Sequence, residues 1–80
     1  MYVELIYDQR NVKEIKNARQ KIEDELTRRV HRVFPDADVR VKPMQANSIN
    51  SDFNKAQKEK VSAIVQEMFD EADGWLVNEE

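Results

Sequence analysis

Eighty residues, of which 40% are hydrophobic and 36% charged, with a formal net charge of −3, are typical of one small folded domain rather than of a disordered chain. The absence of cysteine and the single histidine exclude disulfides, thiolate metal sites and multi-histidine metal sites. One glycine is also too few for the glycine-rich loops that bind phosphate in P-loop and dinucleotide-binding proteins.

The first part of the chain predicts a strand followed by a long helix. Tyr2–Tyr7 alternates apolar and polar side chains and is rich in β-branched and aromatic residues, which favours a strand. From about Val12 the apolar residues recur at helical spacing. We expect this helix to end near Phe34, because Pro35 disfavours helical backbone at the residue before it and has no amide hydrogen.

A second strand is predicted at residues 37–42, where Val39 and Val41 share one face, and Pro43 is expected to limit its far end. A strand, a helix and another strand form a βαβ unit, for which parallel pairing and a right-handed crossover are expected. Turn-forming residues dominate residues 44–53. We place a short third strand around Ser48–Ser51.

The last helix is predicted over residues 54–77, and the rest of the fold is arranged around it. Asn54 is expected to be its N-cap, with Gln57 completing a capping box. Gly74 is expected to end it as a left-handed cap, after which Trp75 folds back onto the core. The predicted fold class is therefore α/β (α+β): one domain over residues 1–80, of order βαβ(β)α, with two helices on one face of a two- to three-stranded mixed sheet. The other face stays in water, where Glu4 pairs across strands with Arg40 or Lys42.

Charge is unevenly distributed along the chain. Residues 1–50 hold ten Lys or Arg against eight Asp or Glu, whereas residues 51–80 hold three against eight, and no Lys or Arg follows Lys60. The polar face of the last helix therefore carries a stripe of carboxylates: Glu59, Glu67, Asp70, Glu71 and Asp73.

This stripe has a spacing close to that of a nucleic-acid strand. At ~1.5 Å rise per residue it spans about 21 Å, so its carboxylates recur every ~4–5 Å. Phosphates along one DNA strand recur every ~3.4 Å. Spacing alone supports two interpretations about equally: an ordinary solvated face, and a surface that imitates one DNA strand for a DNA-binding protein. A calcium site is disfavoured, because the acids lie along a helix without a loop or backbone carbonyls.

A basic edge on the first helix, formed by Lys21, Arg28 and Arg32 with Arg29 nearer the core, offers an alternative contact for phosphate. Asp24 and Glu25 lie among these residues, which favours a solvated edge, and the arginines are also placed to offset the acidic last helix. His31 is interpreted as a surface residue. No nucleophile with a base, paired acid and base, or metal set is evident, so we expect neither an enzyme nor a cofactor.

Four motifs, taken together and in order, resemble the DinI family, the DNA-damage-inducible protein I group. They are Glu25-Leu26-Thr27-Arg28-Arg29-Val30, Phe34-Pro35-Asp36-Ala37, Val39-Arg40-Val41 and Glu71-Ala72-Asp73-Gly74-Trp75-Leu76-Val77. Residues 41–47 make the chain more similar to the virulence-associated MsgA-like branch. Gly74 departs from the pattern, since DinI-like tails often have a second acid at this position.

The resemblance implies a small α/β domain that binds the RecA recombinase filament through an acidic, DNA-mimicking C-terminal helix and so modulates the SOS response. Carried over to this sequence, the contact residues are Glu67, Asp70, Glu71 and Asp73, with Glu79 and Glu80 as an acidic tail. Two alternatives stay open: a stress- or virulence-associated module of the same fold that binds a different basic protein, and direct nucleic-acid binding through Arg28, Arg29 and Arg32.

The expected setting is a cytoplasmic monomer without a membrane segment. The first residues carry acids and no basic leader region, and no apolar run approaches the ~20 residues of a membrane span. Under the leading interpretation the partner is a protein and no direct nucleic-acid contact is made.

Overall fold

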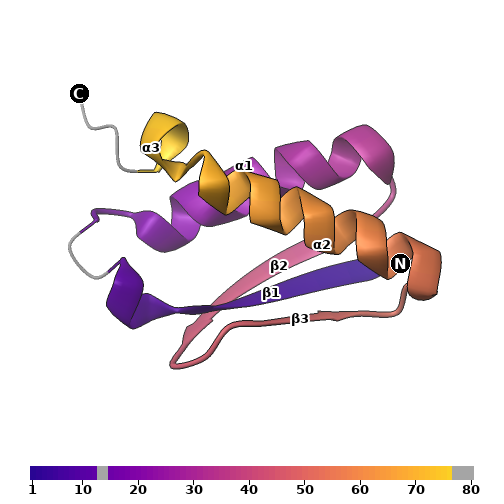
Figure 1. The fold of residues 1–80 in the computed structure, drawn as a ribbon, viewed down its shortest axis with the longest axis horizontal. Helices are drawn as coiled ribbons and strands as arrows, with labels where there is room; N and C mark the ends of the chain where they lie inside the picture. Colours follow the sequence, from indigo (N-terminus) through magenta and orange to yellow (C-terminus); the bar gives the residue numbers. More distant parts are fainter. Residues whose placement is uncertain (13–14, 77–80) are drawn as a thin grey trace.

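The computed structural model describes residues 1–12 and 15–76, and its strands and helices form an α+β domain (Figure 1). The elements in chain order are β1 (Tyr2–Asp8), the 3-10 turn η1 (Gln9–Asn11), α1 (Ala18–Val33), β2 (Asp38–Met44), β3 (Ser48–Ser51), α2 (Lys55–Asp70) and α3 (Ala72–Trp75). The predicted fold class is confirmed.

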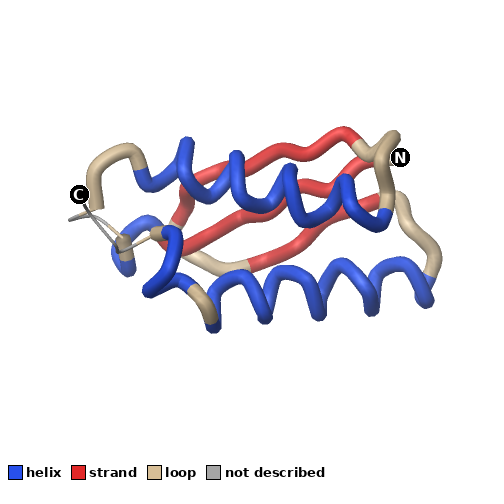
Figure 2. The backbone as a smooth tube through the Cα atoms, turned by 90° about the horizontal axis from the view of Figure 1, so that it is seen from above, coloured by secondary structure: helices blue, strands red, loops and turns tan. Residues whose placement is uncertain are grey.

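β1 is the central strand of a mixed sheet of order β2-β1-β3. It pairs in parallel with β2, with Val3 opposite Val39, and antiparallel with β3, with Val3 opposite Ser51. The parallel βαβ unit and the short strand at Ser48–Ser51 are thus both confirmed. Figure 2 shows that α1 and α2 lie side by side over the same face of this sheet.

The core fills the space between the sheet and the two helices. β1 buries every second side chain, because successive residues of a strand point to opposite faces. Each helix contributes one apolar stripe to the same space. The core side chains that are fully enclosed are Val3, Ile22, Leu26, Val30, Val61 and Met68.

No helix or strand of residues 1–12 and 15–76 covers the opposite sheet face, as expected, but the pairing of side chains on it differs from the prediction. Glu4 accepts a hydrogen bond from Asn50 Nδ2 of β3 at 3.2 Å. Arg40 instead pairs with Asp38 of its own strand at 3.1 Å, with both side chains more than 60% exposed. Such exposed contacts contribute little to stability.

The first helix begins six residues later than predicted. Residues 9–11 form a 3-10 turn, and the residue before α1, Asn17, has a left-handed backbone with φ 57°. Asparagine tolerates this conformation better than most residues. Val12 and Ile15 repeat at helical spacing in the sequence, but they pack onto the core from the connecting segment. The end of the helix at Phe34 is confirmed.

Two further boundary predictions are wrong. β2 runs through Pro43 to Met44, which the sheet permits because β2 is an edge strand, where a missing N–H need not break the sheet. α2 ends at Asp70, before Gly74, and Gly74 has no positive φ. Its N–H donates to the Glu71 carbonyl at 2.9 Å within α3. The capping box of Asn54 and Gln57 at the start of α2 is confirmed.

Candidate functional site

The outward side of α2 and α3 carries five exposed carboxylates, which we call the acidic surface: Glu59, Glu67, Asp70, Glu71 and Asp73. Their direction follows from the core, because Val61, Val65 and Met68 fix which side of α2 faces the sheet. The structure therefore keeps these five predicted site residues exposed on or next to the C-terminal helices. Glu79 and Glu80, the predicted acidic tail, lie outside the described residues.

A break at Glu71 divides the acidic surface. Glu71 caps α2, and its N–H donates to the Glu67 carbonyl at 3.1 Å, after which α3 starts at Ala72. Figure 1 shows α3 turning away from the axis of α2. The carboxylates therefore follow one helix axis only from Glu59 to Asp70, and Asp73 projects from a separate turn.

One carboxylate of the acidic surface is paired within the molecule. Arg29 Nη2 of α1 donates to Glu71 Oε1 at 2.6 Å, and Arg29 Nε donates to Glu25 Oε2 at 2.6 Å. Arg28 Nη2 donates to the other oxygen of Glu25 at 2.5 Å. Within residues 1–12 and 15–76, no other salt bridge reaches the acidic surface. Glu59, Glu67, Asp70 and Asp73 thus lie exposed and outside the described salt bridges.

Burial and hydrogen bonds act in opposite directions on the pKa of Glu25. Glu25 is the one charged residue of the described chain that is buried, with 7% exposure. Burial raises the pKa of its carboxyl, but hydrogen bonds from Arg28 and Arg29 outweigh this, so the net shift of the Glu25 pKa is downward. Hydrogen bonds to Glu25 and then Glu71 raise the pKa of Arg29. Both groups therefore stay charged at neutral pH.

The same network decides how much of the basic edge is available to phosphate. Arg28 and Arg29, two of the three arginines proposed for nucleic-acid contact, are held by carboxylates of this chain. Arg32 is exposed. A guanidinium whose charge is already offset by a carboxylate attracts phosphate less strongly, so the structure favours the intramolecular role of these arginines.

Trp75 packs on the core but keeps part of its surface exposed. Its indole Nε1–H donates to the Met68 carbonyl at 2.7 Å, and its ring lies 6.1 Å from that of Phe69. The break at Glu71 makes this contact possible, because α3 can rotate Trp75 and the buried Leu76 back toward the core. Trp75 thus packs back onto the core, as predicted.

Three further features were considered in the sequence: His31, a metal site and a membrane segment. His31 is exposed, and its Nε2 lies 2.8 Å from the Ala37 carbonyl, which ties the end of α1 to the start of β2. In the part of the chain that the structure describes, no cluster of three His, Cys, Asp or Glu could hold a metal ion. No helix among these residues is both long and apolar enough to cross a membrane.

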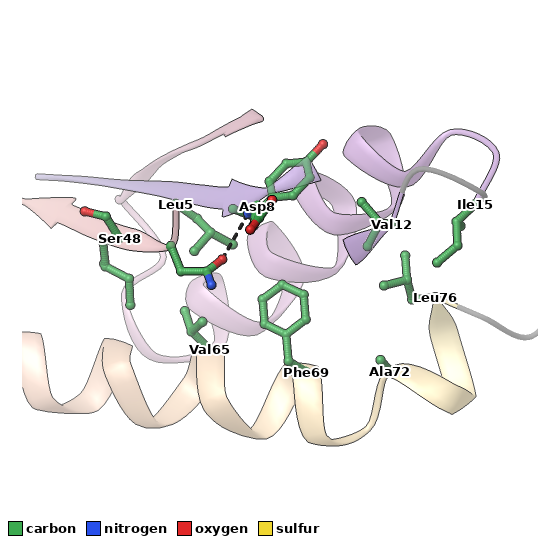
Figure 3. Close-up of a pocket in the computed structure, with 12 residues that line it drawn as sticks. Leu5, Asp8, Val12, Ile15, Ser48, Val65, Phe69, Ala72 and Leu76 are labelled. Carbon is green, nitrogen blue, oxygen red and sulfur yellow. Dashed lines mark hydrogen bonds between the residues drawn. The ribbon is translucent and has the colours of Figure 1, made fainter. Parts of the chain in front are cut away.

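Sequence analysis missed an apolar groove between α2 and β3, shown in Figure 3. Its walls combine β1, β3, the segment after β1 and the C-terminal helices. The one sequence signal near the groove is that Val12 and Ile15 are apolar and follow turn-forming residues. The same pattern is expected at the start of a helix, so it did not indicate a groove.

These features define a class: a small α+β domain with two helices on one face of a three-stranded mixed sheet, whose C-terminal helices present an acidic surface. The family model described as the DinI-like family matches residues 15–76. The Virulence protein MsgA of Salmonella typhimurium (strain LT2) is 58% identical over 79 residues, covering 99% of this chain and 100% of that protein. MsgA of Salmonella typhi matches to the same extent. The chain belongs to the DinI-like family.

Proposed function

We propose that this protein is a non-enzymatic interaction module of the cytoplasm that binds a RecA-like recombinase filament through its acidic surface. One observation carries the proposal: four exposed carboxylates on α2 and α3 lie outside every described salt bridge, and three of them, Glu67, Asp70 and Asp73, follow Lys60, after which the chain has no Lys or Arg. Membership of the DinI-like family supports the class of partner.

The charge pattern suits a partner that binds nucleic acid. A row of like charges creates a field that steers a basic surface toward it and accelerates association. A DNA-binding groove is such a surface, and the carboxylates along α2 offer it a row of negative charges where it would otherwise hold phosphates. In this proposal Glu59, Glu67, Asp70 and Asp73 contact the partner, while Glu71 is held by Arg29. The tail residues Glu79 and Glu80 add to the same field.

The test is to neutralise the acidic surface without touching the network around Glu25. The variant Glu67→Gln, Asp70→Asn, Asp73→Asn leaves Glu71 and its contact with Arg29 in place. We expect it to bind RecA filaments on single-stranded DNA at least about tenfold more weakly than the parent, with a shallower dependence on salt, because exposed charges are screened over ~8–10 Å at physiological ionic strength. Circular dichroism checks that the variant is folded.

The matched control removes charge of the opposite sign. Arg28→Gln with Arg32→Gln should leave filament binding nearly intact. If the protein instead bound DNA directly through these arginines, the same pair of substitutions would abolish binding to bare DNA. A folded triple variant that binds the filament as tightly as the parent, with the same salt slope, would contradict the proposal.

A second candidate is a module of the same fold that binds a different basic protein. The names of the two MsgA relatives, which are virulence proteins, favour it. The acidic surface would then serve the same electrostatic role. If this candidate is right, the parent protein does not bind RecA filaments but captures a basic protein, and the triple variant does not capture that protein. Filament binding by the parent would support the first candidate instead.

A further inference from the structure

Arg29 lies between two carboxylates that belong to different parts of the molecule. Its Nε donates to Oε2 of the buried Glu25 on α1, and its Nη2 donates to Oε1 of Glu71 after α2, both at 2.6 Å. Arg28 occupies the other oxygen of Glu25. Because the N–H groups of a guanidinium form a rigid planar fork, two such contacts fix its orientation. With 17% of its side chain exposed, Arg29 offers a partner little surface of its own.

Glu71 lies at the break in the acidic surface. α2 ends at Asp70 and α3 begins at Ala72, so the backbone of Glu71, with φ −102° and ψ 18°, sets the angle between the two helices. Figure 1 shows that α3 leaves the axis of α2 at this point. Asp73 lies on α3, whereas Glu67 and Asp70 lie on α2. The conformation at Glu71 therefore determines where Asp73 lies relative to the carboxylates of α2.

Carboxylates crowd this break, and one cation reaches them. Glu67 and Glu71 are four residues apart, a spacing at which like charges destabilise a helix. Asp70 and Asp73 add two further exposed charges close by in the chain. Among residues 1–12 and 15–76, the pair of Arg29 and Glu71 is the one salt bridge that joins α1 to the C-terminal helices. Arg29 thus offsets the repulsion at the point where the two helices meet.

The two ends of α3 are held by different contacts. At its far end Leu76 is buried, and the Trp75 indole N–H donates to the Met68 carbonyl. At its near end, the side-chain hydrogen bond is the one between Glu71 and Arg29. A helix of four residues has a single turn and few hydrogen bonds of its own, so its direction depends on what holds its two ends.

We propose that Arg29 is a positioning residue for partner binding, which acts through Glu71 on the direction of α3. It thereby places Asp73 where this carboxylate and those of α2 contact one partner surface together. This inference rests on the proposed function and deepens it, because the acidic surface then depends on its geometry as well as on its charge. Charge alone gives the opposite expectation, since a cation beside the acidic surface weakens the attraction of a basic partner.

Three substitutions separate position from charge. Arg29→Gln removes the guanidinium and makes the surface more negative. Glu71→Ala removes the carboxylate that Arg29 holds, whereas Glu71→Gln removes the same charge but keeps a side-chain oxygen that accepts hydrogen bonds. Arg19→Gln is the matched control, because Arg19 is an exposed arginine of α1 whose salt bridge, to Glu23, involves no residue of the acidic surface.

We expect Arg29→Gln and Glu71→Ala each to weaken binding to RecA filaments on single-stranded DNA about fivefold, whereas Glu71→Gln and Arg19→Gln bind within about twofold of the parent. Circular dichroism checks that all four variants are folded. Tighter binding by Arg29→Gln would show that only its charge matters and would overturn the inference. Equal losses from Glu71→Gln and Glu71→Ala would make Glu71 a direct contact of the partner and would also overturn it.

A double-mutant cycle separates positioning from a general loss of stability. If Arg29 acts by placing Asp73, Arg29→Gln should weaken binding about fivefold in the parent but have little effect in a protein that already carries Asp73→Asn. A variant that was merely less stable would lose the same factor in both proteins. That equal factor would overturn the inference.

Trp75 reports the direction of α3 without any partner. It is the one tryptophan of the chain, and its indole N–H donates to the Met68 carbonyl. In nuclear magnetic resonance spectra the indole signal should move in Arg29→Gln and Glu71→Ala and stay in place in Glu71→Gln. A signal that stays in place in Arg29→Gln would overturn the inference whatever the filament experiment shows. If the parent does not bind RecA filaments, the proposed partner is wrong, and the indole signals decide separately whether Arg29 positions α3.

Discussion

Arg29 and Glu71 join the two helices: the guanidinium on α1 donates at 2.6 Å to the side-chain carboxylate of Glu71, the C-cap residue of α2. The same guanidinium is bound to the buried Glu25, so the pair links the core side of α1 to the edge of the acidic surface. Arg29 is 17% exposed and Glu71 60% exposed. The two partners therefore differ in what they contribute to stability.

Substituting the two partners separately should show this difference. Arg29→Gln leaves the buried Glu25 with one arginine and should lower the free energy of unfolding by about 1.5–3 kcal/mol, the range for hydrogen bonds to charged groups. Glu71→Gln should cost less than ~1 kcal/mol, because its side chain is largely in water. Urea denaturation of both variants and of the double variant measures the coupling. Equal losses from the two single substitutions would contradict this account.

Acid should weaken the fold partly through Glu25. Its pKa is lower in the folded protein than the ordinary 4.5, so the unfolded chain takes up a proton first as the pH falls. The contribution of Glu25 is therefore complete at neutral pH and is lost as the pH drops below about 4.5 through the folded pKa. Glu25→Gln should be less stable than the parent at pH 7 and should lose less stability on acidification. Parallel curves of unfolding free energy against pH would argue against this role.

Trp75 should behave as part of the core. Trp75→Ala should cost about 2–4 kcal/mol, somewhat less than the ~3–5 kcal/mol of a fully buried aromatic residue, because the ring is partly exposed. Trp75→Phe keeps the aromatic contact with Phe69 but loses the hydrogen bond to the Met68 carbonyl. It should therefore lower the free energy of unfolding by about 1 kcal/mol relative to the parent. Thermal unfolding measures both. Unchanged stability with lost partner binding would make Trp75 an interface residue instead.

The start of α2 depends on a reciprocal cap. Asn54 Oδ1 accepts from the Gln57 N–H at 2.8 Å, and Gln57 Oε1 accepts from the Asn54 N–H at 3.1 Å. Asn54→Ala should lower stability by about 1 kcal/mol, whereas Asn54→Asp keeps a side-chain acceptor and should cost much less. Chemical denaturation compares the two variants. An Asn54→Asp protein as unstable as Asn54→Ala would rule out the acceptor as the cause.

Local patterns predicted those elements whose cause is local. The alternation in β1, the stop at Pro35 and the cap at Asn54 each depend on neighbouring residues, and all were predicted correctly. The start of α1 was not, because Val12 and Ile15 pack on the core from a connecting segment, and apolar spacing does not distinguish that arrangement from a helix. Gly74 was misjudged because α2 already ends at Asp70, and the residues after this break, Trp75 and Leu76, pack on the core.

The residues of the candidate site could be predicted from the sequence better than their arrangement in space. The carboxylates that face away from the core followed from helical periodicity, and so did the possibility that the arginines of α1 offset them. Glu71 is the paired carboxylate because of how α1 and α2 pack against each other. The groove beside Phe69 likewise depends on how the C-terminal helices pack against the sheet. Both are products of long-range contacts, which a single sequence does not specify.

The central position of β1 also sets the order in which this sheet can be completed during synthesis. β1 is made first, yet the strands on both its sides, which place Val39 and Ser51 opposite Val3, are made much later. A ribosome that adds roughly 5–20 residues per second therefore exposes the buried side chains of β1 for a few seconds before either neighbour exists. The nascent chain passes this interval with three aggregation-prone positions, Val3, Leu5 and Tyr7, separated by Glu4 and Ile6. Replacing Glu4 with an apolar residue would make residues 3–7 a continuous apolar run. We expect this substitution to lower the yield of protein on expression rather than the stability of the folded protein.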